Sequence, residues 1–347
     1  MKKSVLALIA CAALYAGNTE IIGQDGKKTT FDAPAKRVVI FPMPLTSMYL
    51  AIDSGASHIA GLHADAKKNL SEGFLKKAYP DAMKLNTEVA KVGFTPNVEQ
   101  LISLKPDVVI QWGDQGDGII EPIRRAGIAV VGLKYGTQEL LDGWIEIMGK
   151  ISGNTKKAAD IISWQHGHIK ALQQKAATDS YHPKIVSLQY SKNKLRIAGS
   201  GSYDDFYIKL VGGINPASEI KRFAEISEEQ LMRYNPDIVI LGNFDDEKPA
   251  QFMSRPMFKG IKAVQNKAVY KAPIGGYRWG PPNLEAPLMW LWLRQLSHPK
   301  ENIGLKNKMK ETYKFLYSYK ISEAEIMEVL NVADNSQSSN YAIFKTK

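Results

Sequence analysis

Residues 98–110 read VEQLISLKPDVVI and residues 228–240 read EEQLMRYNPDIVI, so one stretch occurs twice, 130 positions apart. The identities include Glu99 with Glu229, Gln100 with Gln230, Leu101 with Leu231, Pro106 with Pro236, Asp107 with Asp237 and Ile110 with Ile240. Each copy predicts a short helix, a Pro-Asp turn and a buried strand. A single repeat at so long a period indicates two similar lobes and not a solenoid.

The sequence around the repeat alternates between strand-like and helix-like segments. Buried strands are predicted at 37–41, 107–112 and 128–133, and again at 184–188, 236–241 and 267–270. Helices are predicted at about 45–54, 119–126 and 284–296. Strands and helices in turn imply an α/β fold, with mostly parallel sheets covered by helices on both faces.

A long helix is predicted between the two halves, because apolar residues from Ala158 to Ala176 follow helical spacing. About 23 residues at 1.5 Å each reach roughly 34 Å, enough to brace two lobes. The predicted organisation is a lobe over 17–152, a linking helix over 153–180, a second lobe over 181–330 and a polar tail over 331–347. The tail is expected to be loosely ordered.

Composition narrows the class of protein. The 347 residues suffice for two ordinary domains, and the 44% of hydrophobic residues can bury real cores. The formal net charge is +10, but the basic residues occur singly or as pairs such as Lys67-Lys68. That pattern is typical of a solvated basic surface and lacks the motifs of nucleic-acid binding. We therefore expect no nucleic-acid partner, and we expect a monomer.

The N-terminus predicts export through a signal peptide at 1–16. Lys2 and Lys3 precede an apolar run that is too short to cross a bilayer, and Ala16 lies before the expected cut. Cleavage there removes two lysines and no acids, which gives a mature charge of 10 − 2 = +8. It also removes Cys11, the only cysteine, so no disulfide, thiol nucleophile or cysteine metal site would remain. Alternatively, residues 8–11 resemble a lipobox, which would attach a lipid to Cys11.

The two repeats, the early Arg-Val-Val-Ile strand at 37–40, and Gly212-Gly213 before Asn215 together resemble the periplasmic binding proteins of ferric-siderophore, haem and cobalamin importers. The resemblance covers roughly residues 35–320. It implies the class III fold, in which one long helix joins two Rossmann-like lobes and the ligand lies in the cleft between them. It also implies a periplasmic location and a partner, the ABC importer permease of the inner membrane.

Ligands of open parallel sheets bind beyond the carboxyl ends of the strands. Applied to the predicted strands, this rule selects as ligand-binding candidates Met43, His63, Trp112, Tyr190, Tyr203, Tyr277, Arg278 and Trp279. In the last cluster, Arg278 can pair with carboxylate or catecholate oxygens while its aromatic neighbours stack on a planar ligand. Trp112 and Trp279 are both expected to approach the ligand.

Together with the positive net charge, this cluster predicts that the ligand is an Fe(III) chelate, most specifically a ferric siderophore. Haem, cobalamin and a nickel chelate are the alternative ligands. No intrinsic cofactor and no protein metal site are expected. Whether a side chain such as His63 ligates the metal of the cargo stays open too, since a lone histidine more often packs.

No catalytic constellation is evident. The sequence has no Gly-x-Ser-x-Gly elbow, no His-Glu-x-x-His helix and no phosphate-binding Gly-Lys-Ser/Thr loop. We therefore expect a binding protein and not an enzyme. The alternative is a two-lobed metal-dependent enzyme such as a chelatase, which would need a metal-inserting His/Glu pair in the cleft.

Glu99 and Glu229 occupy matched positions near the starts of the two repeated helices, where the helix dipole favours a carboxylate. The resemblance implies a second role for them. A glutamate at this position on each lobe of such proteins meets arginines of the membrane permease.

Overall fold

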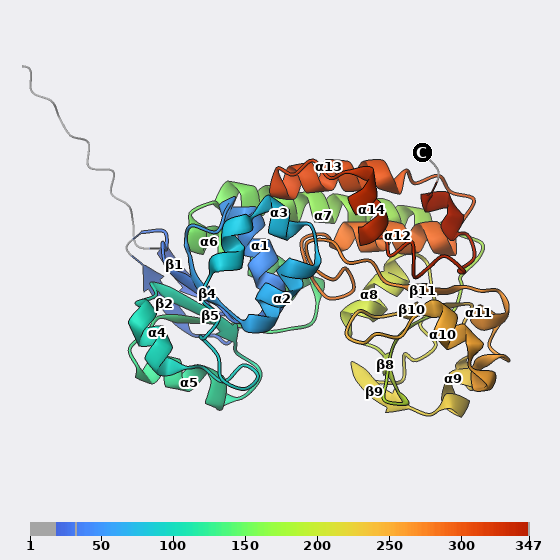
Figure 1. The fold of residues 1–347 in the computed structure, drawn as a ribbon, viewed down its shortest axis with the longest axis horizontal. Helices are drawn as coiled ribbons and strands as arrows, with labels where there is room; N and C mark the ends of the chain where they lie inside the picture. Colours follow the sequence, from blue (N-terminus) through green and yellow to red (C-terminus); the bar gives the residue numbers. More distant parts are fainter. Residues whose placement is uncertain (1–18, 32, 346–347) are drawn as a thin grey trace, which may run out of the picture.

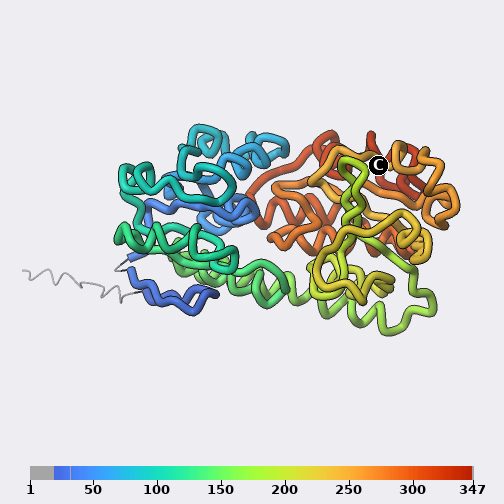
Figure 2. Tube along the Cα trace, turned by 90° about the horizontal axis from the view of Figure 1, so that it is seen from below, coloured from blue at the N-terminus to red at the C-terminus, as the bar shows by residue number. Residues whose placement is uncertain are grey.

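The computed structural model describes residues 19–31 and 33–345, which form two α/β lobes side by side, spanned by one long helix (Figures 1 and 2). The predicted signal peptide and Cys11 lie outside these residues. Within the described part of the chain, no helix is long and apolar enough to cross a membrane.

The first lobe is built on a four-stranded parallel sheet in the order β4-β3-β5-β6. Its strands are β3 (Val38–Ile40), β4 (Ile59–Leu62), β5 (Val108–Trp112) and β6 (Val130–Leu133). Its helices are α1 (Met43–Asp53), α2 (Ala64–Glu72), α3 (Leu75–Ala78), α4 (Val98–Leu104), α5 (Asp117–Arg125) and α6 (Gln138–Ser152), and a hairpin of β1 (Thr19–Ile22) and β2 (Lys28–Phe31) precedes them. All five positions of β5 are buried, as expected of a parallel strand covered on both faces.

The second lobe has a five-stranded mixed sheet in the order β11-β10-β7-β8-β9. Its strands are β7 (Ile185–Ser191), β8 (Lys194–Ala198), β9 (Phe223–Ile226), β10 (Ile238–Leu241) and β11 (Val269–Lys271). Its helices are α8 (Tyr203–Leu210), α9 (Glu228–Tyr234), α10 (Pro249–Ser254), α11 (Lys262–Gln265), α12 (Ala286–Ser297), α13 (Leu305–Tyr317) and α14 (Glu323–Val329). The predicted class III fold is confirmed, and the antiparallel ribbon β8-β9 adds to the parallel strands.

The repeated Pro-Asp turn makes equivalent hydrogen bonds in both lobes. The carboxylate of Asp107 accepts backbone N–H groups of Lys36 at 2.7 Å and Arg37 at 2.9 Å, just before β3. The carboxylate of Asp237 accepts the backbone N–H of Lys184 at 2.8 Å, just before β7. Each aspartate therefore fixes the start of the strand that pairs with its own strand.

The linking helix α7 (Thr155–Ala176) contacts α6 of the first lobe and both α8 and α12 of the second. Its Gln165 is fully buried, accepts a hydrogen bond from Gln138 of α6 at 2.9 Å, and donates to the backbone oxygen of Asn283 at 3.1 Å. Helix α13 runs along the same side of the molecule as α7 and reaches α1 of the first lobe (Figure 1). The lobes are thus joined by more than one helix.

The prediction of a loosely ordered polar tail is wrong for residues 331–345. The side chain of Asn335 accepts the backbone N–H of Lys271 at 2.7 Å and donates to its carbonyl oxygen at 3.0 Å. The hydroxyl of Ser338 donates to the carbonyl oxygen of Val269 at 2.6 Å, and Tyr341 and Phe344 are buried. The polar residues of the tail pair with the backbone of the edge strand β11, which would otherwise lack partners.

Candidate ligand site

A cavity of about 350 Å³, here called the cleft cavity, lies between the lobes. The first lobe lines it with Met43, Pro44, Phe94, Trp112, Gln115 and Tyr135, and the second with Gln189, Arg196, Phe223, Phe244, Tyr277 and Pro281. A smaller chamber and a polar recess beside α2 adjoin it, because all three share Phe244 as a lining residue. The volume lies in the range of small-molecule sites.

The wall from the first lobe is aromatic and uncharged. Trp112 ends β5, and its ring lies edge-on to those of Phe94, Tyr135 and Trp144 at centroid distances of 6.4, 6.2 and 5.6 Å. Burial raises the pKa of Tyr135 well above its usual value, so its hydroxyl stays protonated at neutral pH. Met43 begins α1 directly beyond the carboxyl end of β3. This wall is a rigid aromatic surface, to which the half-buried Phe94 and Tyr135 contribute more exposed area than the buried Trp112.

The wall from the second lobe carries charge. Arg196 lies on β8, between the buried residues Leu195 and Ile197, with its guanidinium 4.8 Å from the centre of the Phe223 ring. Within 19–31 and 33–345, that guanidinium has no hydrogen-bond or ion-pair partner. A guanidinium that lies over a ring and lines a cavity can bind an anionic oxygen without first breaking a hydrogen bond or ion pair.

The guanidinium of Arg278, in contrast to that of Arg196, has hydrogen-bond partners within the protein. Its Nε donates to the carbonyl oxygen of Asn243 at 2.7 Å, its Nη1 to the side chain of Asn69, and its Nη2 approaches a Glu72 carboxylate oxygen at 3.4 Å. Because Asn69 and Glu72 belong to α2 of the first lobe, Arg278 ties the two lobes together at the rim of the cleft. We call this contact the Arg278 clasp.

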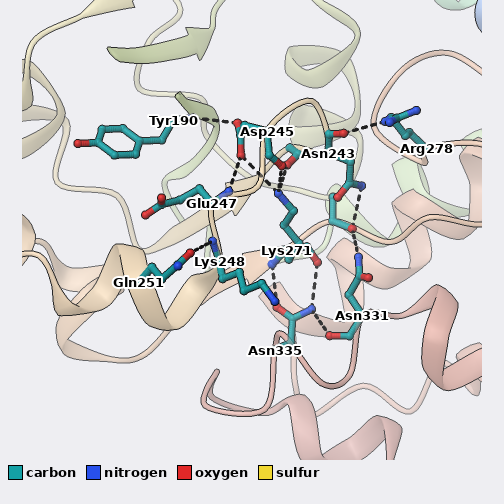
Figure 3. A network of polar contacts seen from close by, with 12 residues as sticks. Tyr190, Asn243, Asp245, Glu247, Lys248, Gln251, Lys271, Arg278, Asn331 and Asn335 are labelled. Atoms are coloured by element: carbon teal, nitrogen blue, oxygen red, sulfur yellow. Dashed lines mark hydrogen bonds and ion pairs between the residues drawn. The ribbon is translucent and has the colours of Figure 1, made fainter. Parts of the chain in front are cut away.

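The loop 242–247, which carries Phe244 into the cleft, is held by a buried lysine (Figure 3). The ammonium of Lys271 donates to the carbonyl oxygens of Gly242 at 2.6 Å and Asp245 at 2.8 Å, and lies 3.4 Å from the Asp245 carboxylate. Burial lowers the pKa of Lys271, and the Asp245 charge opposes that shift. The Phe244 ring is half exposed, yet its backbone is fixed.

Of the residues selected from sequence, Met43, Trp112 and Tyr277 line the cleft cavity, and Arg278 lines the spaces beside it. Tyr190 lies elsewhere. Side chains alternate along β7, so Gln189 faces the cavity while Tyr190 packs edge-on against Phe252 and Phe258 on the other face of the sheet.

Tyr203 and Trp279 are fully buried and outside the cavity lining. The Tyr203 hydroxyl donates to Gln138 at 2.9 Å, in the polar network around Gln165 behind the cleft. The Trp279 indole donates to Glu285 at 2.8 Å. Tyr203 therefore pairs across the two lobes, and Trp279 pairs within the second lobe.

His63 is the N-cap residue of α2, and both of its ring nitrogens have hydrogen-bond partners. Nε2 lies 2.8 Å from the carbonyl oxygen of Gly93, and Nδ1 accepts the backbone N–H of Asp65 at 3.2 Å. No nitrogen is left for a metal. Across the described residues, no group of three or more His, Cys, Asp or Glu side chains could hold a metal ion.

Several cavity residues were not selected from the sequence, and Tyr135, Arg196 and Phe223 are the most informative of them. Tyr135 follows the carboxyl end of β6, so the same topological rule could have found it. Arg196 and Phe223 lie on the antiparallel strands β8 and β9, to which the rule does not apply. The signal that the sequence does contain is the charged Arg196 inside a short apolar strand.

Glu99 and Glu229 are both exposed, in the first turns of α4 and α9. A hydrogen bond with Ser227 lowers the pKa of Glu229. Figure 1 shows α4 and α9 on the outer parts of the two lobes, both away from α7 and α13. The two carboxylates are therefore free to face one large partner.

Known proteins resemble this chain over most of its length. A family described as periplasmic binding proteins matches residues 64–274, more than half of the chain. A periplasmic solute binding protein from Veillonella parvula has a similar fold, with a TM-score of 0.83 and 33% identity, covering 92% of this chain and 99% of that one.

Two curated proteins are also similar. The molybdate-binding protein MolA of Haemophilus influenzae is 23% identical over 88% of this chain and 93% of its own length. Its molybdate-bound structure has a TM-score of 0.76 at 20% identity, over 87% of this chain and 99% of that one. The Fe(3+)-citrate-binding protein YfmC of Bacillus subtilis is 23% identical over 74% of this chain and 78% of its own length.

Proposed function

The chain belongs to the periplasmic binding protein family of ABC-transporter components, and on that premise we propose that it carries an iron complex, a ferric siderophore first, to its importer permease. The similar proteins are substrate-binding components and not enzymes. The proposed cycle is therefore capture of the complex in the cleft cavity, followed by docking to the permease, with no covalent step.

The observation that carries the proposal is the pairing of an unpartnered guanidinium with an aromatic wall. Arg196 supplies a positive charge on one side of the cleft cavity, and the aromatic side chains of Trp112 and Phe94 line the other. An iron chelate with anionic oxygens and planar arms presents the complementary features. Haem, cobalamin and a nickel chelate remain alternatives for the same cavity.

A small oxyanion is the second candidate, favoured by the similarity to a molybdate-binding protein and by the chamber of about 50 Å³ that Arg196 and Arg278 both line. It ranks behind the chelate because Asp204 lines the same chamber and would repel an anion.

The test is a titration of tryptophan emission with ferric citrate, a ferric catecholate, haem, cyanocobalamin and molybdate. An iron chelate should quench Trp112 at one equivalent and be recovered unchanged. Arg196→Ala should weaken its binding roughly tenfold to a hundredfold, the scale of a hydrogen bond to a charged group. Arg233→Ala, an exposed arginine on α9, is the control.

Each other outcome decides the question too. Equal affinity of wild type and Arg196→Ala for every iron complex would remove the charge argument. Binding of molybdate alone would replace the iron complex by the oxyanion. Release of free metal or an altered ligand would instead favour the chelatase-like alternative.

A further inference from the structure

The chamber beside the cleft cavity lies within the second lobe, between β7, β8 and the first turn of α8. Its polar lining comprises Ser187, Gln189, Arg196, Asp204, Tyr207 and Asn243, with Tyr135 and Arg278 at its edge toward the first lobe. A water molecule needs about 10–15 Å³ of such space, so about 50 Å³ admits a few water-sized groups and no macrocycle. Only a narrow arm of a ligand fits.

Asp204 is the unusual residue of this chamber. Its carboxylate accepts a hydrogen bond from the Tyr207 hydroxyl at 2.7 Å, and no cation pairs with it in the described part of the chain. The neighbouring Asp205, in contrast, pairs with Lys209 at 2.7 Å. Burial raises the pKa of Asp204, and hydrogen bonds with Ser187 and Tyr207 oppose the shift only in part. Asp204 is half-buried, and a carboxylate kept partly from water without a cation is destabilising.

Asn243, another residue that lines the chamber, has an unsatisfied side-chain oxygen. The side-chain nitrogen of Asn243 donates to the carbonyl oxygens of Ala272 at 2.8 Å and Pro273 at 3.1 Å. Its Oδ1 is buried and has no hydrogen-bond partner among the described residues. In the part of the chain that the structure describes, the chamber thus contains a carboxylate without a cation and a residue with an unsatisfied oxygen, while the cationic Arg196 lies where the chamber meets the cleft cavity.

We propose that the chamber is a subsite for a free amine of the cargo, whose ammonium group pairs with Asp204 while Arg196 binds oxygens of the chelate body. An ammonium is compact, carries three donors and accepts nothing, which matches a lining rich in acceptors. The inference rests on the proposed function, because the arm needs a chelate body in the cleft cavity. It narrows the cargo to an Fe(III) chelate with an amine-bearing arm, a class that excludes haem.

The experiment compares matched probes that differ only in the amine. One pair is the ferric complex of desferrioxamine B, a trihydroxamate with one free amine, and that of its N-acetyl derivative. The other is the ferric complex of N-(2-aminoethyl)-2,3-dihydroxybenzamide and that of its N-acetyl derivative. In at least one pair, the amine form should bind the wild-type protein tenfold tighter or more. Asp204→Asn should abolish that preference and change the affinity for the acetylated probe less than twofold.

Asp246→Asn is the matched control, because Asp246 is an exposed acid that lines the recess beside α2 but not the chamber. It should keep the preference for the amine. Equal affinity for both members of each binding pair, or a preference that survives Asp204→Asn, would overturn the subsite and leave the proposed function standing. If no iron complex binds at all, the proposed function falls and the subsite with it.

Discussion

The two lobes share one folding unit and differ in what they present to the cleft. In both, a short helix, a left-handed turn and a Pro-Asp pair lead into a buried strand, β5 or β10, and the aspartate fixes the start of the paired strand. The first lobe then lines the cavity with uncharged residues, whereas the second adds the ribbon β8-β9 with Arg196 and Phe223. The repeated unit therefore forms the shared framework of the two lobes, and the segments in which the lobes differ determine the chemistry of the site.

The largest expected effect comes from breaking the symmetry at the matched carboxylates. We predict that Glu99→Arg and Glu229→Arg each abolish uptake while ligand affinity and folding stay nearly intact. Both side chains are exposed, so reversing the charge disturbs no buried contact, and Glu229 loses only its hydrogen bond with Ser227 and its attraction to Arg233 at the helix surface. Exposed charges at an interface determine orientation and specificity more than raw affinity. Uptake into proteoliposomes beside a binding titration of the same variant measures both.

Glu311→Arg provides the control for charge reversal, since Glu311 is an exposed acid on α13, along the opposite side of the molecule. Uptake should be unaffected there. Normal uptake by a Glu99→Arg, Glu229→Arg double variant would show that the two carboxylates serve only as helix-start residues.

The frame was predictable because its information is local. Runs such as Val38-Val39-Ile40, bounded by turns, predict buried strands whatever their neighbours, and the two copies of the repeat support each other. The hairpin of β7 and β8 was not, because its turn uses Lys192 and Asn193 at φ 52° and 60°, without the Asn-Gly pair that usually marks such a hairpin.

The candidate site was predictable only in part, because the direction in which each side chain points from its strand or helix decides whether it lines the cavity. Gln189 and Tyr190 are neighbours at the end of one strand, and a shift of one residue would exchange which of them faces the cavity. Arg278 was placed correctly at the cleft, but its partners on α2 come from a helix more than two hundred residues away in sequence. No local pattern could reveal that clasp.

A second asymmetry is the buried Glu285 of the second lobe. Its oxygens accept hydrogen bonds from the Tyr317 hydroxyl at 2.7 Å, the Gly276 backbone at 2.8 Å and the Trp279 indole at 2.8 Å. Burial nevertheless raises its pKa from 4.5 to about 7. The folded state therefore holds a proton that the unfolded state releases above pH 4.5, so stability falls as pH rises from about 4.5 to 7.

We predict that this loss amounts to about 2–3 kcal/mol of unfolding free energy between pH 5 and 8, and that Glu285→Gln removes it. Urea unfolding of both proteins at the two pH values measures it. Glu325→Gln is the control: burial raises the pKa of Glu325, but contacts with Lys77 and Ser322 outweigh it and lower the value to about 2. Its contribution is constant from pH 5 to 8. A pH dependence in Glu285→Gln equal to that of wild type would contradict the prediction.

The smallest expected effect concerns the two copies of the repeat, at the matched residues that follow each repeated helix in a left-handed conformation. Lys105 and Asn235 end α4 and α9 with φ of 46° and 43°. A left-handed lysine costs about 1–2 kcal/mol, and glycine removes that cost but adds about 0.5–1 kcal/mol of chain entropy, so Lys105→Gly should stabilise by about 0.5–1 kcal/mol. Asparagine tolerates this conformation, and the Asn235 side chain accepts the backbone N–H of Lys262 at 3.0 Å. Asn235→Gly should therefore destabilise by about 0.5–1 kcal/mol. Urea midpoints at unchanged m-values should move in opposite directions; movement in the same direction would mean that the two turns are not equivalent.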